Sequence, residues 1–413
     1  MEERTIPFKK FYTSFIIAGA IIAALGVGFH FIQTANGWKQ IYDLPWFIVI
    51  VGIFLLSYGG IKLITNKDDS AVIDISKRAI KMFLMNNGII IALGIMVIII
   101  MIIEPNFMKL KVLRDILAQA SPRIIIALGI CFTLLIAGTD LSACRMVGLA
   151  AVISASMMQN PDYANRFFPD LPQLPIIIPI IAAILACMVF GLLNGFLVAR
   201  YQMHPFIATL AVQVIIYGVC SLYFDMPPNN SQPIGGIRQD FANIGQYMLL
   251  KEQLPSNIGG IPILIPIAGI FIFAIWFVLN KTVFGKNVYA IGGNREAAIV
   301  SGINVPLTIV CIFVLASALY GVGGVLEAAR TAGATNNYGV GYELDAIAAC
   351  VVGGVSLNGG VGKVSGIIIG VLIFTIIQYG LQFIGVNAMW QQVIKGVIIA
   401  VAVAIDLSKY RGK

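Results

Sequence analysis

Two stretches of the sequence place ionisable side chains and small residues inside long apolar runs. The first is GTDLSACRMVGLAA at 138–151, where Asp140 and Arg145 interrupt apolar sequence. The second, at 333–366, introduces Glu343 and Asp345 and then a run rich in glycine. Ionisable groups and irregular backbone are costly in lipid, so such stretches normally line a protein cavity or a water-filled path. We therefore predict broken helices at both places.

The acidic side chains also have simpler explanations. Asp140 and Arg145 can form a structural charge pair that fixes a helix end, because a nearby arginine neutralises an acid locally. The sequence leaves this pair and a pathway role equally open. Glu327 and Arg330, at i,i+3 spacing, are expected to form a local pair at the outer surface.

The loop at 281–305 contains a third pattern, EAAIVSG, which predicts a short helix. Asn294 or Gly293 can cap that helix, an acid suits its first turn, and Gly302 can end it. Its small alanines would let it fit a groove of a partner, with Glu296 offering a charged contact. The alternative is an interfacial helix with no partner.

The sequence lacks the residue patterns needed for metal binding, redox chemistry or nucleotide binding. His30 and His204 are too far apart in the chain to suggest a metal site, and the six scattered cysteines form no CxxC pair. A phosphate loop needs a glycine five residues before its Gly-Lys pair and Ser or Thr after it, whereas the pair at 362–363 is preceded by leucine and followed by valine. We therefore expect no metal, redox or nucleotide site in this chain.

Composition places these motifs in a membrane protein. Of the 413 residues, 59% are hydrophobic and 11% are charged, and the mean hydropathy is +0.92, which excludes a soluble fold. At about twenty residues per span, hydropathy predicts an all-α polytopic fold of twelve spans. The expected spans are near 13–33, 45–64, 88–103, 124–138, 146–158, 175–199, 205–223, 261–280, 306–327, 344–356, 364–383 and 389–406.

The distribution of Lys and Arg predicts that both termini are cytoplasmic. With that orientation, the cytoplasmic loops and tails carry nearly twice as many Lys and Arg as the outer ones. The loop at 104–123 is an exception, and we expect it to contain a short interfacial helix. The net charge of +8 lies mainly at membrane edges, so anionic lipid and topology explain it better than nucleic acid does.

The chain is expected to have two modules. A polar connector at 65–87 separates an N-terminal helix pair, 1–87, from a ten-span module, 88–413. The two broken stretches fall at matching places in the halves of the ten-span module, each between the first and second helix. Their first helices run in opposite directions, which is the pattern of inverted repeats in transporters.

Several ungapped motifs, found in the family's order, resemble the permeases of ribose-type sugar importers of the ATP-binding cassette (ABC) class. They are GTDLSACR at 138–145, HPFIATL at 204–210, the EAAIVSG loop, and YELDAIAACVVGGVSLNGGVG at 342–362. The resemblance covers about 88–413. In this family the Glu-Ala-Ala-x-x-x-Gly pattern docks on the ATPase subunit. The residues that the resemblance assigns to coupling are Glu296, Ala297, Ala298 and Gly302.

The resemblance also implies partners, a substrate and a location. It implies a permease in the bacterial inner membrane that dimerises and pairs with an ABC ATPase subunit and an extracytoplasmic sugar-binding protein. ATP and Mg would be bound by the ATPase, and the implied cargo is a monosaccharide, galactose or a methyl galactoside. Because the binding protein would supply high-affinity recognition, polar residues of the permease should shape a weak path. Those residues are Thr139, Asp140, Asn336 and Glu343.

Two departures from the family's pattern and one alternative function accompany this interpretation. Cys144 stands where the family has glycine, which puts tight packing there in doubt, and residues 1–87 have no counterpart in a ten-span permease. An ATP-independent carrier or channel would also explain broken helices and buried acids, although not EAAIVSG. An intramembrane enzyme is disfavoured, because no nucleophile with a base and no HExxH motif occurs.

Overall fold

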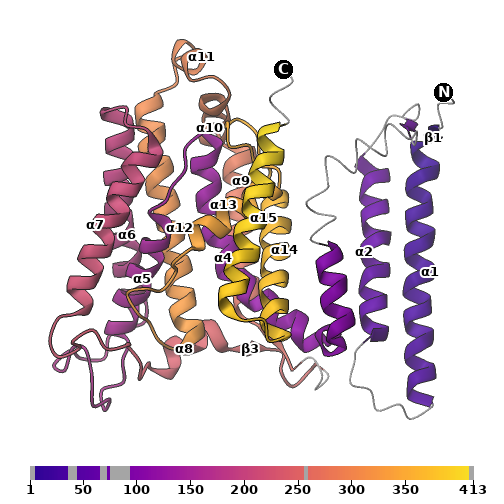
Figure 1. Cartoon of the computed structure of the whole chain (residues 1–413), viewed down its shortest axis with the longest axis horizontal. Coiled ribbons are helices and arrows are strands. Elements are labelled where there is room, and N and C mark those ends of the chain that lie inside the picture. Colours follow the sequence, from indigo (N-terminus) through magenta and orange to yellow (C-terminus); the bar gives the residue numbers. More distant parts are fainter. Residues whose placement is uncertain (1–4, 36–43, 66–71, 75–93, 255–258, 409–413) are drawn as a thin grey trace. The chain divides into compact units, whose positions relative to one another are not determined.

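The computed structural model describes residues 5–35, 44–65, 72–74, 94–254 and 259–408 (Figure 1). They form two compact units. One contains the described residues up to Asp115 together with 377–388, and the other contains the remainder. In the described part of the chain, strands occur only as two short antiparallel pairs, so the predicted all-α fold is confirmed.

The first unit begins with two long helices, α1 (Phe8–Ala35) and α2 (Leu44–Thr65), which lie at the positions of the first two predicted spans. Glycines bring their backbones together: a Cβ on Gly52 would lie 2.4 Å from the Ala23 nitrogen, closer than any side chain allows. This small-residue contact is typical of helix pairs in membranes.

A two-stranded sheet accompanies this helix pair. Strand β1 (Thr5–Pro7) precedes α1 and pairs antiparallel with β2 (Val72–Asp74), which follows α2. The predicted module boundary between residues 87 and 88 lies outside the described residues.

One predicted feature is wrong. Instead of a short interfacial helix in 104–123 followed by a new span, the short 3-10 helix η1 (Pro105–Met108) leads directly into α4 (Leu110–Leu135), a single helix of 26 residues. The apolar spacing that suggested an interfacial helix is the first part of α4. Pro122 lies inside the helix and does not end it.

The remaining helices have the following bounds: α5 (Ala143–Met157), α6 (Ile177–Arg200), α7 (Pro205–Phe224), α8 (Gln239–Gln246), α9 (Leu264–Lys281), α10 (Val283–Gly293), α11 (Arg295–Val300), α12 (Val305–Thr331), α13 (Tyr342–Val352), α14 (Val364–Phe383) and α15 (Ala388–Ser408). Strands β3 (Met248–Leu249) and β4 (Ile261–Pro262) pair antiparallel before α9. In the described part of the chain, seven helices are long and apolar enough to cross a membrane. Each of the twelve predicted ranges contains a helix.

The predicted helix breaks are confirmed. Helices α5 and α13 have 15 and 11 residues, too few to cross a bilayer alone, since a span needs about twenty. Irregular segments at 136–142 and 332–341 precede them. Each short helix thus follows a long one, α4 in the first half and α12 in the second.

The long helices α4 and α12 run antiparallel. A Cβ on Gly323 would contact Ile126, whereas a Cβ on Gly129 would contact the Ala316 carbonyl and the Tyr320 ring. Residue numbers in α12 therefore decrease along the contact as those in α4 increase. Opposite directions for the first helix of each half are expected of inverted repeats.

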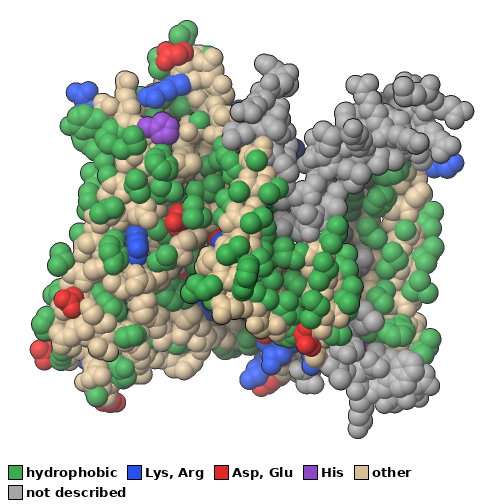
Figure 2. All heavy atoms as spheres, viewed as in Figure 1, with side chains coloured by type: hydrophobic (Ala, Val, Ile, Leu, Met, Phe, Trp, Pro, Cys, Tyr) green, Lys and Arg blue, Asp and Glu red, His purple; other side chains and the backbone are tan. Residues whose placement is uncertain are grey.

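Helix α12 lies at the centre of the second unit, against α5 and α6. Helices α6 and α7 expose apolar side chains on their outward faces, with Val189 64% and Leu222 74% exposed. Figure 2 shows this green surface, with few blue or red side chains in the middle of the second unit. Such faces suit contact with lipid.

The connection between α7 and α9, which contains α8, holds the segment before α13. Ile234 and Ala334 exchange backbone hydrogen bonds of 2.9 and 3.0 Å, and Gly245 of α8 packs on the Arg330 backbone. These contacts fix where the irregular segment 332–341 leaves α12.

Candidate functional site

Helix α11 is the short helix that the EAAIVSG pattern predicted. The Asn294 side-chain oxygen caps it by accepting a hydrogen bond from the Ala297 N–H at 3.0 Å. The turn that follows closes at Gly302, whose φ is +82° and whose N–H donates to the Ile299 carbonyl at 2.9 Å. A left-handed residue after a helix favours glycine, so the predicted start and end are both confirmed.

The side chains of α11 divide between a buried and an exposed face. Ala298 is buried in a cluster with Ile291 of α10, whereas Glu296 is exposed. Val300 is 87% exposed and Ile299 is 49% exposed. Helix α11 itself lies at one end of the second unit in Figure 1. Exposed aliphatic side chains beside a charge are typical of contact surfaces. These two residues were not predicted as contacts, although they lie inside the motif.

Helix α10 joins α11 to the end of α4. A Cβ on Gly292 would lie 1.7 Å from the Leu135 carbonyl oxygen and 2.6 Å from the Gly360 nitrogen. The Gly360 N–H in turn donates to the Leu135 carbonyl at 2.9 Å. Three backbone segments therefore meet without side chains between them, and α10 is in direct contact with the first helix break and with the glycine-rich segment.

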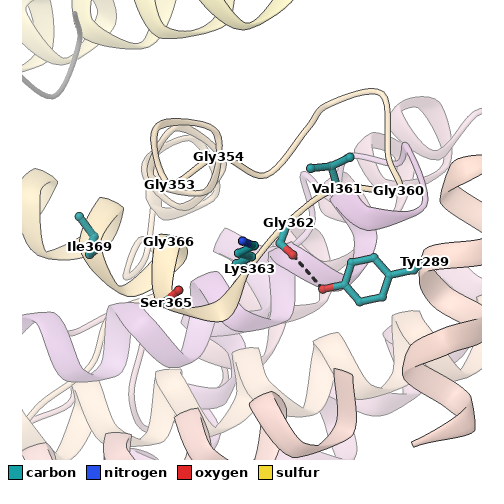
Figure 3. Close-up of a pocket in the computed structure, with 10 residues that line it drawn as sticks. All are labelled: Tyr289, Gly353, Gly354, Gly360, Val361, Gly362, Lys363, Ser365, Gly366 and Ile369. Carbon is teal, nitrogen blue, oxygen red and sulfur yellow. Dashed lines mark hydrogen bonds between the residues drawn. The ribbon is translucent and has the colours of Figure 1, made fainter. Parts of the chain in front are cut away.

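A hollow of about 450 Å³ lies beside this contact, between α10 and the glycine-rich segment at 353–366. Figure 3 shows Tyr289 extending from α10 toward Gly362, and its hydroxyl donates to the Gly362 carbonyl at 2.9 Å. Burial raises the pKa of the Tyr289 phenol, so the hydroxyl keeps the proton that it donates. The hydrogen bond is a second link between α10 and this segment.

The first helix break is held by buried hydrogen bonds. One oxygen of the fully buried Asp140 carboxylate accepts hydrogen bonds from the Ser142 N–H, at 2.9 Å, and from its hydroxyl. Asn194 of α6 donates to the Ser142 hydroxyl at 2.8 Å, and Thr209 of α7 donates to the Thr139 carbonyl at 3.2 Å. The segment is therefore fixed by α6 and α7.

Asp140 and Arg145 do not form the alternative charge pair. The second carboxylate oxygen of Asp140 has no partner among the described residues. The Arg145 guanidinium lies over the Tyr217 ring, 4.2 Å from its centroid, and its Nη1 is 3.4 Å from Asn337 Oδ1 and 3.5 Å from the Asn336 carbonyl. Arg145 therefore connects the first break to α7 and to the second irregular segment.

Two of the predicted pathway residues lie near Arg145. Glu343, in the first turn of α13, is buried beside Cys144 of α5, and its Oε2 has no partner among the described residues. The Asn336 side chain donates to the Ser221 hydroxyl of α7 at 3.2 Å. Thr139 and Asp140 lie at the start of the same break, on its α6 and α7 side. Asn336 and Glu343 thus flank the junction around Arg145, whereas Thr139 and Asp140 lie beside Thr209, nearer the other end of α7.

Close packing at this junction does not need a glycine at position 144. The Cys144 side chain is itself buried, and Gln213 of α7 donates to its sulfur at 3.5 Å. The close approach is instead made by glycines nearby: a Cβ on Gly148 would lie 2.7 Å from the Tyr338 carbonyl, and one on Gly339 would lie 2.8 Å from the Cys144 carbonyl.

Two ion pairs lie in the second half of the chain. Glu327 and Arg330 form the expected ion pair, at 2.8 Å, but the expected surface position is wrong for Glu327, which is fully buried and also accepts a hydrogen bond from Tyr342 at 3.5 Å. Asp345 of α13 and Lys395 of α15 form a second pair, at 2.9 Å. This second pair was not predicted from the sequence, because fifty residues separate its members.

Comparisons with known proteins agree with this architecture. A protein-family model described as "Branched-chain amino acid transport system / permease component" matches residues 112–403. The galactose/methyl galactoside import permease protein MglC of Escherichia coli (strain K12) is 46% identical over 339 residues, covering 82% of this chain and 99% of the relative. The protein of the same name from Haemophilus influenzae is 49% identical over 330 residues, covering 80% of this chain and 96% of the relative.

A more distant relative is the ribose import permease protein RbsC of Escherichia coli (strain K12), 32% identical over 329 residues, covering 80% of this chain and 96% of the relative. No solved structure matches the chain significantly. Both the family model and the relatives cover most of the ten-span region that carries the helix breaks and α11. The chain therefore belongs to this family of transport-system permeases.

Proposed function

We propose that this chain is the transmembrane subunit of an ATP-driven importer of galactose or a methyl galactoside. The observation that carries the proposal is the 46% identity to a galactose/methyl galactoside import permease over 99% of that relative's length. The geometry agrees, because an exposed capped helix is joined through backbone contacts to two helix breaks. The substrate follows the relatives' names, with ribose as the second candidate.

The chain works with a separate ATPase subunit and with a periplasmic sugar-binding protein. It is a permease subunit and not an enzyme, so it holds no cofactor, and ATP and Mg belong to the ATPase. ATP binding closes the ATPase dimer, and α11 transmits the movement through α10 to the Leu135 end of α4 and to Gly360. The residues proposed for coupling are Glu296, Ala297, Ala298 and Gly302, together with Ile299 and Val300; the buried Ala298 holds α11 on α10, and the exposed side chains make the contact with the ATPase.

The working permease is proposed to be a homodimer in the bacterial inner membrane. Arg145 is only half-buried, Asn337 is exposed, and Tyr217 is 41% exposed on a helix that otherwise presents apolar side chains outward. An arginine and amides in this position are too costly to face lipid. A second copy would cover them and leave a polar path between the copies, shaped by Asn336 and Glu343 beside the patch and by Thr139 and the buried Asp140, which hold the first helix break. Both termini are cytoplasmic, and 1–87 is a module added to the permease, 88–413.

Reconstitution tests this function directly. The chain would be placed in proteoliposomes with its ATPase and the sugar-binding protein, and entry of labelled galactose would be measured with ATP, without ATP and without the ATPase. We expect uptake only in the complete system. Uptake that persists without the ATPase would instead indicate the ATP-independent carrier or channel.

Changing the exposed face of α11 should release the ATPase. We expect the double variant Glu296→Lys, Gly302→Val, and separately Val300→Asp, to reduce ATPase co-purification and galactose uptake at least about tenfold, since a buried apolar anchor is commonly worth about 2 kcal/mol or more. Val283→Asp is the matched control, because Val283 is 72% exposed on α10 and lies outside the motif. Normal attachment and uptake in the double variant would contradict a coupling role for α11.

Asp140→Asn should lower galactose uptake by about tenfold, because hydrogen bonds to a charged acceptor contribute about 1.5–3 kcal/mol. The measurement is uptake together with ATP hydrolysis stimulated by the binding protein. Asp225→Asn, in the exposed connection after α7, is the control and should have no effect. Unchanged uptake and unchanged ATP hydrolysis in Asp140→Asn would show that Asp140 does not shape the path.

A further inference from the structure

Arg145, Tyr217 and Asn337 form a polar patch, and none of the three is among the predicted pathway residues. The three side chains come from α5, from α7 and from the irregular segment before α13. The guanidinium lies 4.2 Å from the Tyr217 ring centroid, and Nη1 is 3.4 Å from Asn337 Oδ1. These contacts hold the guanidinium over the ring and beside the amide, which reduces the cost of using it in binding.

The patch is accessible on one side and continuous with buried polar groups on the other. Tyr217 is 41% exposed and Asn337 is exposed, whereas Glu343 is 8% exposed and its Oε2 has no partner among the described residues. Gln213, one turn before Tyr217 on α7, lies beside the same Cys144 as Glu343. A molecule entering from the exposed side would meet the aromatic ring and the guanidinium before the carboxylate.

The balance of charge and hydrogen-bonding groups selects an uncharged ligand. Glu343 lies beside Cys144, which precedes Arg145 in the chain, so a ligand at the junction meets a cationic donor and an acidic side chain together, a setting that suits a neutral ligand better than an ion. Arginine supplies only donors, carboxylate supplies only acceptors, and side-chain amides supply both. A compound with several hydroxyl groups, each a donor and an acceptor, matches this set, and its apolar C–H face can pack on the Tyr217 ring.

We propose that Arg145, Tyr217 and Asn337 form a low-affinity subsite for a neutral monosaccharide within the transport path, an inference that rests on the proposed importer function. Arg145 donates to neighbouring hydroxyl groups, Asn337 bonds a further hydroxyl, and Tyr217 packs against the ring face. Few hydrogen bonds and partial exposure keep the affinity low, which allows the sugar to leave toward the cytoplasm.

The test uses the complete transporter in proteoliposomes and measures sugar moved per ATP hydrolysed. We expect Arg145→Gln and Tyr217→Leu to lower galactose uptake by about tenfold, consistent with the loss of one charged hydrogen bond or one stacked face. ATP hydrolysis stimulated by the binding protein should stay within about twofold of the unaltered transporter, so the sugar moved per ATP should fall. Tyr217→Phe keeps the ring and should retain uptake.

Controls separate a sugar contact from a packing role. Tyr247→Leu removes an aromatic that is 52% exposed outside the patch and should change neither quantity. The ratio of galactose to ribose uptake should change in Arg145→Lys, because a lysine keeps the charge but loses the planar set of donors. Proportional loss of uptake and ATP hydrolysis in both Arg145→Gln and Tyr217→Leu, or normal uptake in both, would overturn the subsite. Absence of ATP-driven galactose uptake in the unaltered transporter would instead reject the importer function.

Discussion

Replacing Gly292 with valine should abolish sugar uptake and greatly reduce the amount of folded permease. A Cβ at this position would lie 1.7 Å from the Leu135 carbonyl oxygen and 2.6 Å from the Gly360 nitrogen, and backbone atoms cannot rotate away as a side chain can. Overpacking of a tight contact typically costs about 1–3 kcal/mol, and a clash with backbone on two sides should reach at least the upper end of that range. The measurements are the yield and thermal stability of detergent-solubilised permease and ATP-driven uptake.

The adjacent glycine provides the control for this prediction. A Cβ on Gly293 would have no other atom within 4 Å, and its φ is not left-handed, so Gly293→Val should fold and should be far less damaging. Gly292→Ala adds only a methyl group, so its effect should lie between those of Gly292→Val and Gly293→Val. If it folds, we expect bound ATPase with reduced uptake, because α10 has been moved away from Leu135 while the exposed face of α11 is intact. Wild-type stability and uptake in Gly292→Val would contradict direct backbone contact between α10 and the end of α4.

Features set by local sequence could be predicted. The helix α11 follows from a capping side chain at Asn294 and a glycine at Gly302, both of which act within four residues of the backbone that they satisfy. The spans follow from runs of apolar side chains that have no alternative partner to lipid or one another. The error at 104–123 has the same origin: cations beside an apolar stripe are typical of an interfacial helix, but here they belong to the first turns of the longer α4.

Features set by packing between distant segments could not be predicted. Asp140 and Arg145 are five residues apart, yet one is held by Ser142 of its own segment while the other reaches Tyr217 and Asn337. Which partner each charge takes depends on how α5, α7 and the segment before α13 pack together. The residues next to each charge in the sequence do not determine that packing. The exposure of Val300 was missed for a related reason, because composition alone does not tell which aliphatic side chains have nothing to pack against.

Neutralising either member of the Asp345 and Lys395 pair should impair the permease severely, and neutralising both should restore much of its function. The Lys395 Nζ is 2.9 Å from Asp345 Oδ2, and the side chains are only 19% and 16% exposed. Lys395 lies in the largely apolar α15, where a lone ammonium is expensive. Removing one partner of a buried pair costs about 3–5 kcal/mol because the remaining charge is uncompensated, whereas replacing both partners is often close to neutral.

Single and double variants show whether stability and uptake depend on the pairing of Asp345 with Lys395 or on either charge by itself. Asp345→Asn and Lys395→Gln should each lower the yield of folded permease and galactose uptake, while Asp345→Asn with Lys395→Gln should recover both. The exchanged pair, Asp345→Lys with Lys395→Asp, should also recover stability if α13 and α15 tolerate the altered side-chain lengths. Because Glu343 lies two residues before Asp345 on α13, loss of the pair should also displace a residue of the proposed path. A double neutral variant no better than the single ones would contradict a pairing role and would indicate that one of the two charges has a separate function.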